Sequence, residues 1–570
     1  MRSVAASFLA LAGNAAGQIV SAIIAGRMLS SAALSVIGVS LPVYYAYGAL
    51  GAMAGIGATA VCSRLIGERE FMKARQAHTL SYVILILFAI GLTVPILMFT
   101  DPIVQFLGAS PDIFEETRAY VRAISMGGIF IMMIYPSYNL LRLDGRNLAA
   151  AVSFIIMAAL NILLDLVFLI GLKSGVSGIA VATVLSSGVA GMFGNILLLR
   201  KSENLRAVRP QAGSLRLIRN ILWAGSPGAM EYACFLFCAL FINNMLVAQF
   251  GSHAISVYKV VDSVNSFALV VIWSFSGALV AFAGVFLAEK DTVSVKQLLA
   301  LAFKRGGPAV LAVTVFCIVF ADRIAALFGI PDAATAEAVR IFAFSLPLSL
   351  LLNIIIYIHI ANHRAALANT LLASKLFVWI AILAYPLSDA FGLAGVWHSF
   401  WMSEAITLLI VFLASLILRH RDKNIAPLFL FDVSAERRGS YKAFIVRPTS
   451  ESISKCAADI VDFAEANALS LGEAMRISLA LEELLVVIAE NCKPEYVNVR
   501  ILIHDGAIIL SLRNTGAKFN PVEYAQNVGG DKKMDVMGVN MVLKLAVSVD
   551  YRSTFGVNNN TIVLEKGMSA

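Results

Sequence analysis

The sequence predicts a polytopic α-helical membrane protein with a soluble α+β domain at its C-terminal end. Hydrophobic residues make up 59% of the 570-residue chain and charged residues only 14%, which departs strongly from the composition of soluble proteins. The apolar residues come in repeated runs of about 20, the length that spans a bilayer core of about 30 Å. Beyond about residue 424 no such run occurs, and short strand patterns alternate with amphipathic helix patterns.

Twelve membrane spans in two similar sets of six are expected. The stretch FLGASPD at 106–112 returns as FGIPD at 328–332, and GVSGIAVAT at 175–183 returns as GLAGVWHSF at 392–400. Such a repeat predicts two lobes with a cavity between them, the place where transporters commonly bind substrates and ions. The expected spans are 5–26, 36–61, 78–99, 120–141, 149–171, 177–199, 220–248, 254–286, 306–322, 339–360, 366–386 and 392–418.

Basic residues concentrate in alternate loops. One set of loops holds the runs 64–75, 200–219 and 419–423, while the other set carries scattered residues such as Arg27 and Lys173. Because cytoplasmic loops of membrane proteins are enriched in Lys and Arg, both termini are expected to be cytoplasmic. This distribution also accounts for the net charge of +8, so no nucleic-acid partner is expected.

An aspartate inside an apolar span marks the first candidate site. Asp165 lies in the fifth expected span, Asn161 lies four residues earlier on the same helical face, and Thr183 lies in the next span. A carboxylate, an amide oxygen and a hydroxyl suit a proton or a small cation such as Na⁺. The alternative interpretation is that Asp165 only forms a structural hydrogen bond with a neighbouring helix.

Further charged residues fall within the second set of spans. Glu231 has no charged neighbour close to it in its own helix. If its side chain faces the central cavity, it would attract an organic cation or carry a proton. Lys259 lies three residues before Asp262, so these two form either a structural ion pair or part of a substrate cavity. Lys375 and Glu404 are a candidate pair between neighbouring helices.

Several stretches of the apolar part resemble the multidrug and toxic compound extrusion (MATE) family of cation-coupled antiporters. These stretches are GATAVCSRLIGERE at 57–70, LGASPDIFEETRAYVR at 107–122, LLRLDGRN at 140–147 and the segment from NILLD to VAT at 161–183. The resemblance covers residues 1–420. It implies a MATE-like N-lobe over 1–200, a cytosolic linker over 201–219 and a MATE-like C-lobe over 220–420.

The MATE resemblance also implies a cation-coupling site in the N-lobe. In the family an Asn, an Asp four residues later and a Thr eighteen further on meet an Asp of the first helix, and Asn161, Asp165 and Thr183 reproduce this spacing. The acid expected five residues before Gly26 is replaced by Ser21. The site therefore carries one negative charge fewer than the family pattern, and both H⁺ and Na⁺ remain candidates for the coupling ion.

The C-terminal part resembles the histidine-kinase-like ATPase domains of anti-sigma-factor kinases. The matching stretches are ISLALEEL at 477–484, LRNTGAKFNP at 512–521 and DVMGVNMVLKLAVSVDYRSTFGVNNNTIVLEK at 535–566. The resemblance implies a cytosolic α+β sandwich over residues 430–570. An open antiparallel sheet covered by helices on one face fits the strand and helix patterns.

Within this second resemblance the nucleotide site is degenerate. Glu483 fits the family's glutamate, but the Asn that would hold Mg²⁺ four residues later is Val487, and the Asp that would read adenine is Asn514. Gly516 and Gly538 match glycines of the two nucleotide loops. Because valine offers no oxygen and Asn presents both a donor and an acceptor, an inactive domain kept for binding or regulation is expected.

Two functions are compatible with these features. The first is a secondary active efflux transporter of the bacterial inner membrane, which exchanges small organic solutes of multidrug type, including cations, for H⁺ or Na⁺ by alternating access. The second is a membrane-tethered signalling protein whose membrane part senses a solute and whose tail regulates a cytosolic protein. Neither requires a catalytic residue or a metal site, and no phosphate-binding loop occurs in residues 1–420 to let ATP drive transport.

Overall fold

The computed structural model divides the chain into two compact units. The first contains Met1–Gly284 with Gln297–Leu416, and the second contains Val285–Lys296 with Ile417–Ala570. The residues that the structure describes are 2–67, 70–144, 146–202, 205–209, 215–288, 291–362, 364–434, 440–504, 507–527, 537–554 and 557–565.

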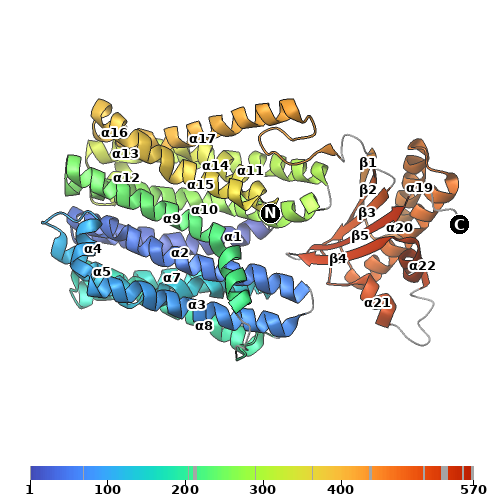
Figure 1. Cartoon of the computed structure of the whole chain (residues 1–570), viewed down its shortest axis with the longest axis horizontal. Helices are drawn as coiled ribbons and strands as arrows, with labels where there is room; N and C mark the ends of the chain where they lie inside the picture. The colour runs from blue at the N-terminus through green and yellow to red at the C-terminus, as the bar shows by residue number, and fades with distance from the viewer. Residues whose placement is uncertain are drawn as a thin grey trace. The chain divides into compact units, whose positions relative to one another are not determined.

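Long helices build the first unit (Figure 1). The first half of the chain forms α1 (Arg2–Met28), α2 (Ser31–Gly67), α3 (Phe71–Met98), α4 (Thr100–Phe106), α5 (Phe114–Met126), α6 (Gly128–Leu143), α7 (Asn147–Leu166), the π-helical turn η1 (Val167–Gly171) and α8 (Gly175–Lys201). The second half forms α9 (Leu215–Phe250), α10 (Ser252–Ala288), α11 (Thr292–Val319), α12 (Ala321–Leu327), α13 (Ala333–Ala343), α14 (Ser345–Ala361), α15 (Ala365–Ala373), the π-helical turn η2 (Ser374–Val378), α16 (Trp379–Phe391) and α17 (Leu393–Arg421).

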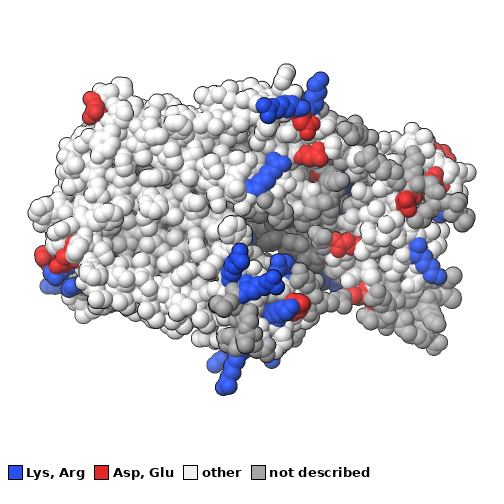
Figure 2. Space-filling model, in the orientation of Figure 1, with Lys and Arg blue, Asp and Glu red and all other residues white. Residues whose placement is uncertain are grey.

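Ten helices among the described residues are long and apolar enough to cross a membrane, and the pair α5 and α6, bent by 48°, makes eleven if it counts as one span. The expectation of twelve spans therefore stays a prediction, with α1 covering the first expected span. On the face shown in Figure 2, charged side chains are nearly absent from a broad band of the helical unit. Large apolar side chains such as Leu87 and Ile90 are more than half exposed, as expected of surfaces that contact lipid.

Two segments that were expected to be loops are partly helical. α11 begins at Thr292, well before the expected start at 306, and α8 and α9 shorten the expected 201–219 linker by extending to Lys201 and starting at Leu215. Hydropathy marks only the part of a helix that lies in hydrocarbon, so charged helical turns beyond the membrane escape it. Asp291 directly precedes α11 and accepts a hydrogen bond from the Ser294 backbone N–H at 3.0 Å, which stabilises this early start.

Close helix contacts join the two halves of the first unit. α2 packs along α9, and a Cβ at Gly57 would lie 2.0 Å from the Ile221 carbonyl oxygen, so glycine permits this approach. Near the end of α1, a Cβ at Gly26 would lie 1.9 Å from the Phe328 carbonyl oxygen. The Arg27 Nε donates to the Leu327 carbonyl oxygen at 3.0 Å. The end of α1 is therefore held directly against α12.

The tail contains a five-stranded antiparallel sheet in the order β1-β2-β3-β5-β4. The strands are β1 (Ser440–Val446), β2 (Val497–His504), β3 (Ala507–Asn514), β4 (Ser548–Thr554) and β5 (Val557–Glu565), and the helices are α19 (Ser450–Ala466), α20 (Leu471–Cys492), α21 (Pro521–Asn527) and α22 (Met537–Leu545). An antiparallel sheet with helices, as expected from the strand and helix patterns, is present. That the tail is a histidine-kinase-like ATPase domain stays a prediction.

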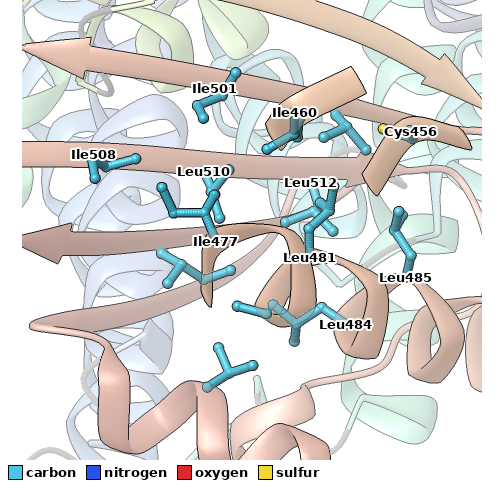
Figure 3. Close-up of a cluster of buried hydrophobic side chains, with 14 of the residues drawn as sticks. Cys456, Ile460, Ile477, Leu481, Leu484, Leu485, Ile501, Ile508, Leu510 and Leu512 are labelled. Carbon is cyan, nitrogen blue, oxygen red and sulfur yellow. The ribbon is translucent and has the colours of Figure 1, made fainter. Parts of the chain in front are cut away.

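One apolar core holds the sheet against its helices (Figure 3). Alternate residues of β2 and β3, such as Ile501 and Leu510, face α19 and α20, where Ile460 and Leu481 are fully buried. Residues between them, such as Arg500, face the opposite side of the sheet, because side chains alternate along a strand. The sheet therefore has one apolar face, covered by helices, and one face that carries polar and charged groups.

This core yields the first testable prediction. Ile501→Ala removes a fully buried side chain and is expected to lower the free energy of unfolding of the tail by about 2–5 kcal/mol. Ile445→Ala on the neighbouring strand is the matched control, because Ile445 is 78% exposed and its change is expected to stay within about 0.5 kcal/mol. Hydrogen exchange of the strand amides in the full-length protein measures both, and equal effects would contradict the core described above.

Candidate functional site

The four residues expected to form the N-lobe cation site lie together where α1, α7 and α8 meet. Ser21 Oγ lies 2.5 Å from Asp165 Oδ2 and 3.0 Å from Asn161 Oδ1. Asn161 Nδ2 lies 3.5 Å from Thr183 Oγ1. Asp165 is fully buried, and Ser21 and Asn161 are nearly so. The residues that the sequence spacing linked, together with Ser21 at the position where the family has an acid, thus form one compact cluster of oxygen atoms.

The charge of Asp165 has no basic counterpart in this cluster. Its Oδ1 is buried without a hydrogen-bond partner among the described residues, while Oδ2 accepts from a neutral hydroxyl. Ser21 has a single proton and can donate to only one of its two neighbours at a time. A carboxylate buried in this way requires a proton or a cation to be stable. The π-helical turn η1 follows directly after α7, and such turns often occur at functional sites.

The first unit contains two neighbouring cavities: one lies between its two halves, and the other is lined by the second half together with Tyr45. The first, of about 60 Å³, is lined in large part by aromatic side chains, including Tyr44, Tyr135, Tyr232 and Trp273. The Tyr135 and Tyr232 rings meet edge to face with centroids 5.6 Å apart. The other cavity, of about 50 Å³, is lined by several charged residues. Volumes of this size hold a few water molecules, so binding of a larger solute requires the helices to move apart.

The charged cavity contains two of the three residues expected in a substrate cavity. Glu231 and Asp262 both line it, whereas Lys259 lines a different cavity beside Ser21. Lys259 Nζ donates to Asp262 Oδ2 at 2.6 Å, and Tyr45 Oη donates to Asp262 Oδ1 at 2.8 Å. Asp262 is therefore fully engaged by its neighbours, which favours the structural ion pair among the two interpretations of the sequence. Glu231 has no salt bridge within the described residues.

Lys375 and Glu404 complete the charged cavity. Lys375 Nζ lies 3.5 Å from Glu404 Oε1 and 3.2 Å from Ser349 Oγ, and Glu404 Oε2 is buried without a hydrogen-bond partner among the described residues. Lys375 belongs to the π-helical turn η2, and its carbonyl oxygen accepts from Ser403 Oγ at 2.7 Å. The sequence signal for this pair was two opposite charges in neighbouring apolar spans, and spacing alone could not show that they meet.

In the tail, the position expected to read adenine is engaged by the protein itself. Asn514 Oδ1 accepts from the Gly516 backbone N–H at 3.0 Å and from Asn558 Nδ2 at 3.2 Å. Asn514 and Asn558 are both almost completely buried. A Cβ at Gly516 would lie 2.1 Å from the Cys492 carbonyl oxygen. Packing against the end of α20 therefore explains this glycine without a nucleotide.

The other expected nucleotide-site residues lie on α20 and α22. Glu483 and Val487 are one helical turn apart on α20, and Val487 is buried in the apolar interior. Gly538 lies in the first turn of α22, and residues 528–536 before it are outside the described part of the chain. A buried valine offers no oxygen to Mg²⁺, so the described residues of this region do not fit a Mg²⁺–nucleotide site.

Comparison with known proteins relates the membrane part to transporters. The sequence model of the MatE family matches residues 6–167 and 227–385, more than half of the chain. The multidrug export protein MepA of Staphylococcus haemolyticus is 25% identical over 406 residues, which cover 70% of this chain and 88% of the relative. MepA of Staphylococcus aureus is 24% identical over 407 residues with the same coverage.

Solved structures share the fold. An inward-facing conformation of a multidrug resistance MATE family transporter of the MOP superfamily matches 73% of this chain and 95% of its own, with a TM-score of 0.65 and 22% identity. A MOP superfamily transporter from Pyrococcus furiosus matches 74% of this chain and 97% of its own, with a TM-score of 0.62 and 21% identity. The helices of the first unit thus have the MATE fold, and with more than half of its residues matched the chain belongs to the MatE family of multi-pass membrane transporters.

Proposed function

We propose that the protein is a secondary active efflux transporter that exchanges small organic solutes for a coupling ion by alternating access. The observation that carries the proposal is the buried carboxylate of Asp165, which has one oxygen without a hydrogen-bond partner among the described residues. Such a group binds and releases a proton or cation as its surroundings change. The names of the relatives, multidrug export proteins, support efflux as the direction of transport.

The coupling ion is proposed to be H⁺ rather than Na⁺. Asp165 is accompanied by a hydroxyl from Ser21 and an amide from Asn161, so the site supplies a single negative charge. A lone carboxylate is neutralised by one proton, which needs no further ligands. Na⁺ binding would have to rely on the neutral oxygens for the rest of its coordination shell. A site with two acids would favour the metal cation more strongly.

Organic cations are the proposed substrates. The charged cavity has three carboxylates, Glu231, Asp262 and Glu404, against the two ammonium groups of Lys259 and Lys375 that contact them. Ionisation of all five groups leaves one negative charge in excess. The adjoining cavity is lined by aromatic rings, whose faces attract cations. An apolar surface with a few charged groups is typical of small-molecule sites.

The proposed location is the inner membrane of a bacterium, with both termini in the cytoplasm. The contacts of Gly26 and Arg27 with α12 lie on the side with few basic residues, which the charge distribution assigns to the outside. Ser252 Oγ donates to Asp112 Oδ2 at 2.8 Å on the same side. These contacts between the two halves support a conformation that is closed toward the outside.

A regulatory role is proposed for the tail, with nucleotide binding weak or lost. The apolar core of the sheet domain is well packed, while Val487 and the internally bonded Asn514 do not suit Mg²⁺ or adenine. The second candidate function, a membrane-tethered signalling protein that controls a cytosolic partner, has the same support from the tail. Gradient-driven solute flux distinguishes the two, because only the transporter requires it.

Asp165→Asn tests the coupling site. The substitution keeps the size of the side chain but removes its charge and its ability to bind a proton, so efflux driven by a pH gradient is expected to fall to the level of vesicles without the protein. Everted membrane vesicles with the fluorescent cation ethidium provide the measurement. Asp389→Asn, at an exposed position of α16, is the matched control and is expected to retain wild-type flux. Full activity of Asp165→Asn at equal protein amounts would exclude this site.

Ser21→Asp tests the choice of ion. The substitution adds a second carboxylate beside Asp165, which is expected to create a response to an inward Na⁺ gradient at fixed pH that the wild-type protein lacks. Ser21→Asn, similar in size but uncharged, separates charge from shape and is expected to give no such response. Wild-type flux that rises steeply with the Na⁺ gradient would refute the proposal of proton coupling.

Calorimetry tests the tail. Titration of the full-length protein with ATP is expected to show weak binding. The affinity is expected to be the same with and without Mg²⁺, because Val487 supplies no oxygen ligand to the ion. Val487→Asn restores that ligand and is expected to make any binding stronger in the presence of Mg²⁺. Tight Mg²⁺-dependent binding by the wild-type protein, or phosphate transfer that Glu483→Ala abolishes, would show that the domain is an active nucleotide-binding domain.

A further inference from the structure

The turn between α10 and α11 belongs to the same compact unit as the tail. Val285–Lys296 groups with Ile417–Ala570, and Asp291 in this turn is completely buried. One carboxylate oxygen, Oδ1, accepts from the Ser294 backbone N–H at 3.0 Å and caps the start of α11. The second oxygen, Oδ2, contacts the sheet. A single side chain thus connects the first turn of a long helix to the tail domain.

Two arginines of the sheet converge on Asp291. Arg500 Nη1 lies 3.2 Å from Asp291 Oδ2, and Arg513 Nη2 lies 2.8 Å from the same oxygen. The arginines come from neighbouring strands, whose register pairs Arg500 with Ser511 and Arg513 with Asn498. Residues paired in this way lie on one face of the sheet. Both arginines therefore lie on the face turned away from the apolar core of the tail.

Further contacts fix both guanidinium groups. Arg513 lies over the Phe286 ring with its Cζ 4.3 Å from the ring centroid, and its Nη1 donates to Ser294 Oγ at 3.2 Å. Arg500 lies over the Tyr441 ring with its Cζ 5.4 Å from the centroid. Cations and aromatic rings attract each other in this arrangement. The turn contributes Phe286, Asp291 and Ser294 to the contact, so the sheet contacts both the end of α10 and the start of α11.

The charged groups of this contact are buried together, and the ion pairs are close contacts of opposite charge rather than aligned hydrogen bonds. The side chains of Arg500 and Arg513 are only 4% and 10% exposed, and that of Asp291 is 0% exposed. Removing charged groups from water is costly unless opposite charges meet with good geometry. Neutralising Asp291 would leave two neighbouring buried guanidinium groups without this counter-charge. Asp291 of the turn and the two arginines of the sheet are therefore held together by opposite charge within one chain.

We propose that this two-arginine clamp on Asp291 is the point through which the tail acts on transport. α10 ends in the clamped turn and, nearer its start, carries Asp262, which lines the charged cavity, and Lys259, which lines the cavity beside Ser21. A change in the tail would alter the position of this turn and thereby of α10 and α11. The inference rests on the proposed transport function. It gives the two arginines on the polar face of the sheet the role of binding Asp291 of the turn between α10 and α11.

Asp291→Asn is the decisive variant, because Asn also caps helices through its side-chain oxygen. The variant therefore keeps the cap of α11 but loses the ion pairs. In the full-length protein, the backbone amides from Asp291 to Lys296 and those of β2 and β3 are expected to exchange hydrogen faster than in the wild-type protein. The initial rate of ethidium efflux is expected to fall at least about fivefold, the lower range of coupling between sites. Arg513→Gln is expected to change exchange and efflux in the same way. The double variant with Asp291→Asn is expected to change them no further than either single variant does.

Asp332→Asn is the matched control. Asp332 caps α13 by accepting from the Thr335 backbone N–H at 2.6 Å and pairs with His253 at 2.9 Å, so its substitution also keeps a cap and removes an ion pair. Exchange at the α10–α11 turn and efflux are both expected to stay at wild-type values. Arg513→Lys, which keeps the charge but not the forked geometry, is a milder variant should Asp291→Asn fail to fold, and a partial loss of both signals is expected.

Each outcome has a distinct meaning. Unchanged exchange in Asp291→Asn would overturn the clamp, and increased exchange with wild-type efflux would overturn its role in transport. Additive effects of Asp291→Asn and Arg513→Gln would also count against it, because two members of one contact cannot act independently. Absence of gradient-driven efflux in the wild-type protein would instead refute the proposed function and with it the regulatory role, while the exchange data would still decide whether the clamp exists.

Discussion

Charge buried among apolar helices is the constraint on which this structure depends. Hydrocarbon provides no water for a carboxylate, so each such group must be neutralised by a neighbour, a proton or a bound cation. Asp262 has a neighbour, since Lys259 lies 2.6 Å away and Tyr45 occupies its other oxygen. Among the described residues, the carboxylate of Asp165 accepts a hydrogen bond from the neutral hydroxyl of Ser21, and its other oxygen has no hydrogen-bond partner. The first carboxylate is neutralised within the chain, whereas the second is the one proposed to bind a coupling ion.

The two halves of the membrane unit use similar positions in different ways. In each half, the fifth expected span contains a π-helical turn: η1 lies at the end of the span in the first half, and η2 lies inside the span in the second half. In each half, polar side chains of the fifth span also contact polar side chains of the sixth. In the first half the bridge is neutral, between Asn161 and Thr183. In the second half Lys375 supplies an ammonium group of its own to Glu404. The two halves of an internal repeat thus differ: one has a buried carboxylate with neutral neighbours, and the other has a buried carboxylate beside an ammonium group.

The sequence was sufficient to predict most elements, but it indicated a contact between distant residues only where a family spacing links them. Apolar runs and alternating strand patterns are local, so most helices and the strands around Ile501 and Leu510 could be predicted from neighbouring residues. The cluster around Asp165 was predicted because a family spacing links α7 and α8, and the missing acid at Ser21 could be read in the same way. The contact of Asp291 with Arg500 joins residues far apart in the chain, and no local pattern indicates it. The early start of α11 depends on a cap that hydropathy cannot detect.

Helix α10 shows how these features combine. Its neighbours α9 and α11 contain Pro227 and Pro308, whereas α10 continues from Ser252 to Ala288 without a proline. This helix has 37 residues and is about 55 Å long at 1.5 Å per residue. Sharp kinks in helices arise mainly at prolines and at Gly/Ser pairs, and α10 contains one such pair, Ser276 and Gly277, between Asp262 and the clamped turn. This pair is the place where a displacement of the turn is expected to bend the helix. Under the proposed function, an ion pair at a cavity and a clamped turn on the same helix would connect the tail to the proposed substrate path, whether or not the tail binds a nucleotide.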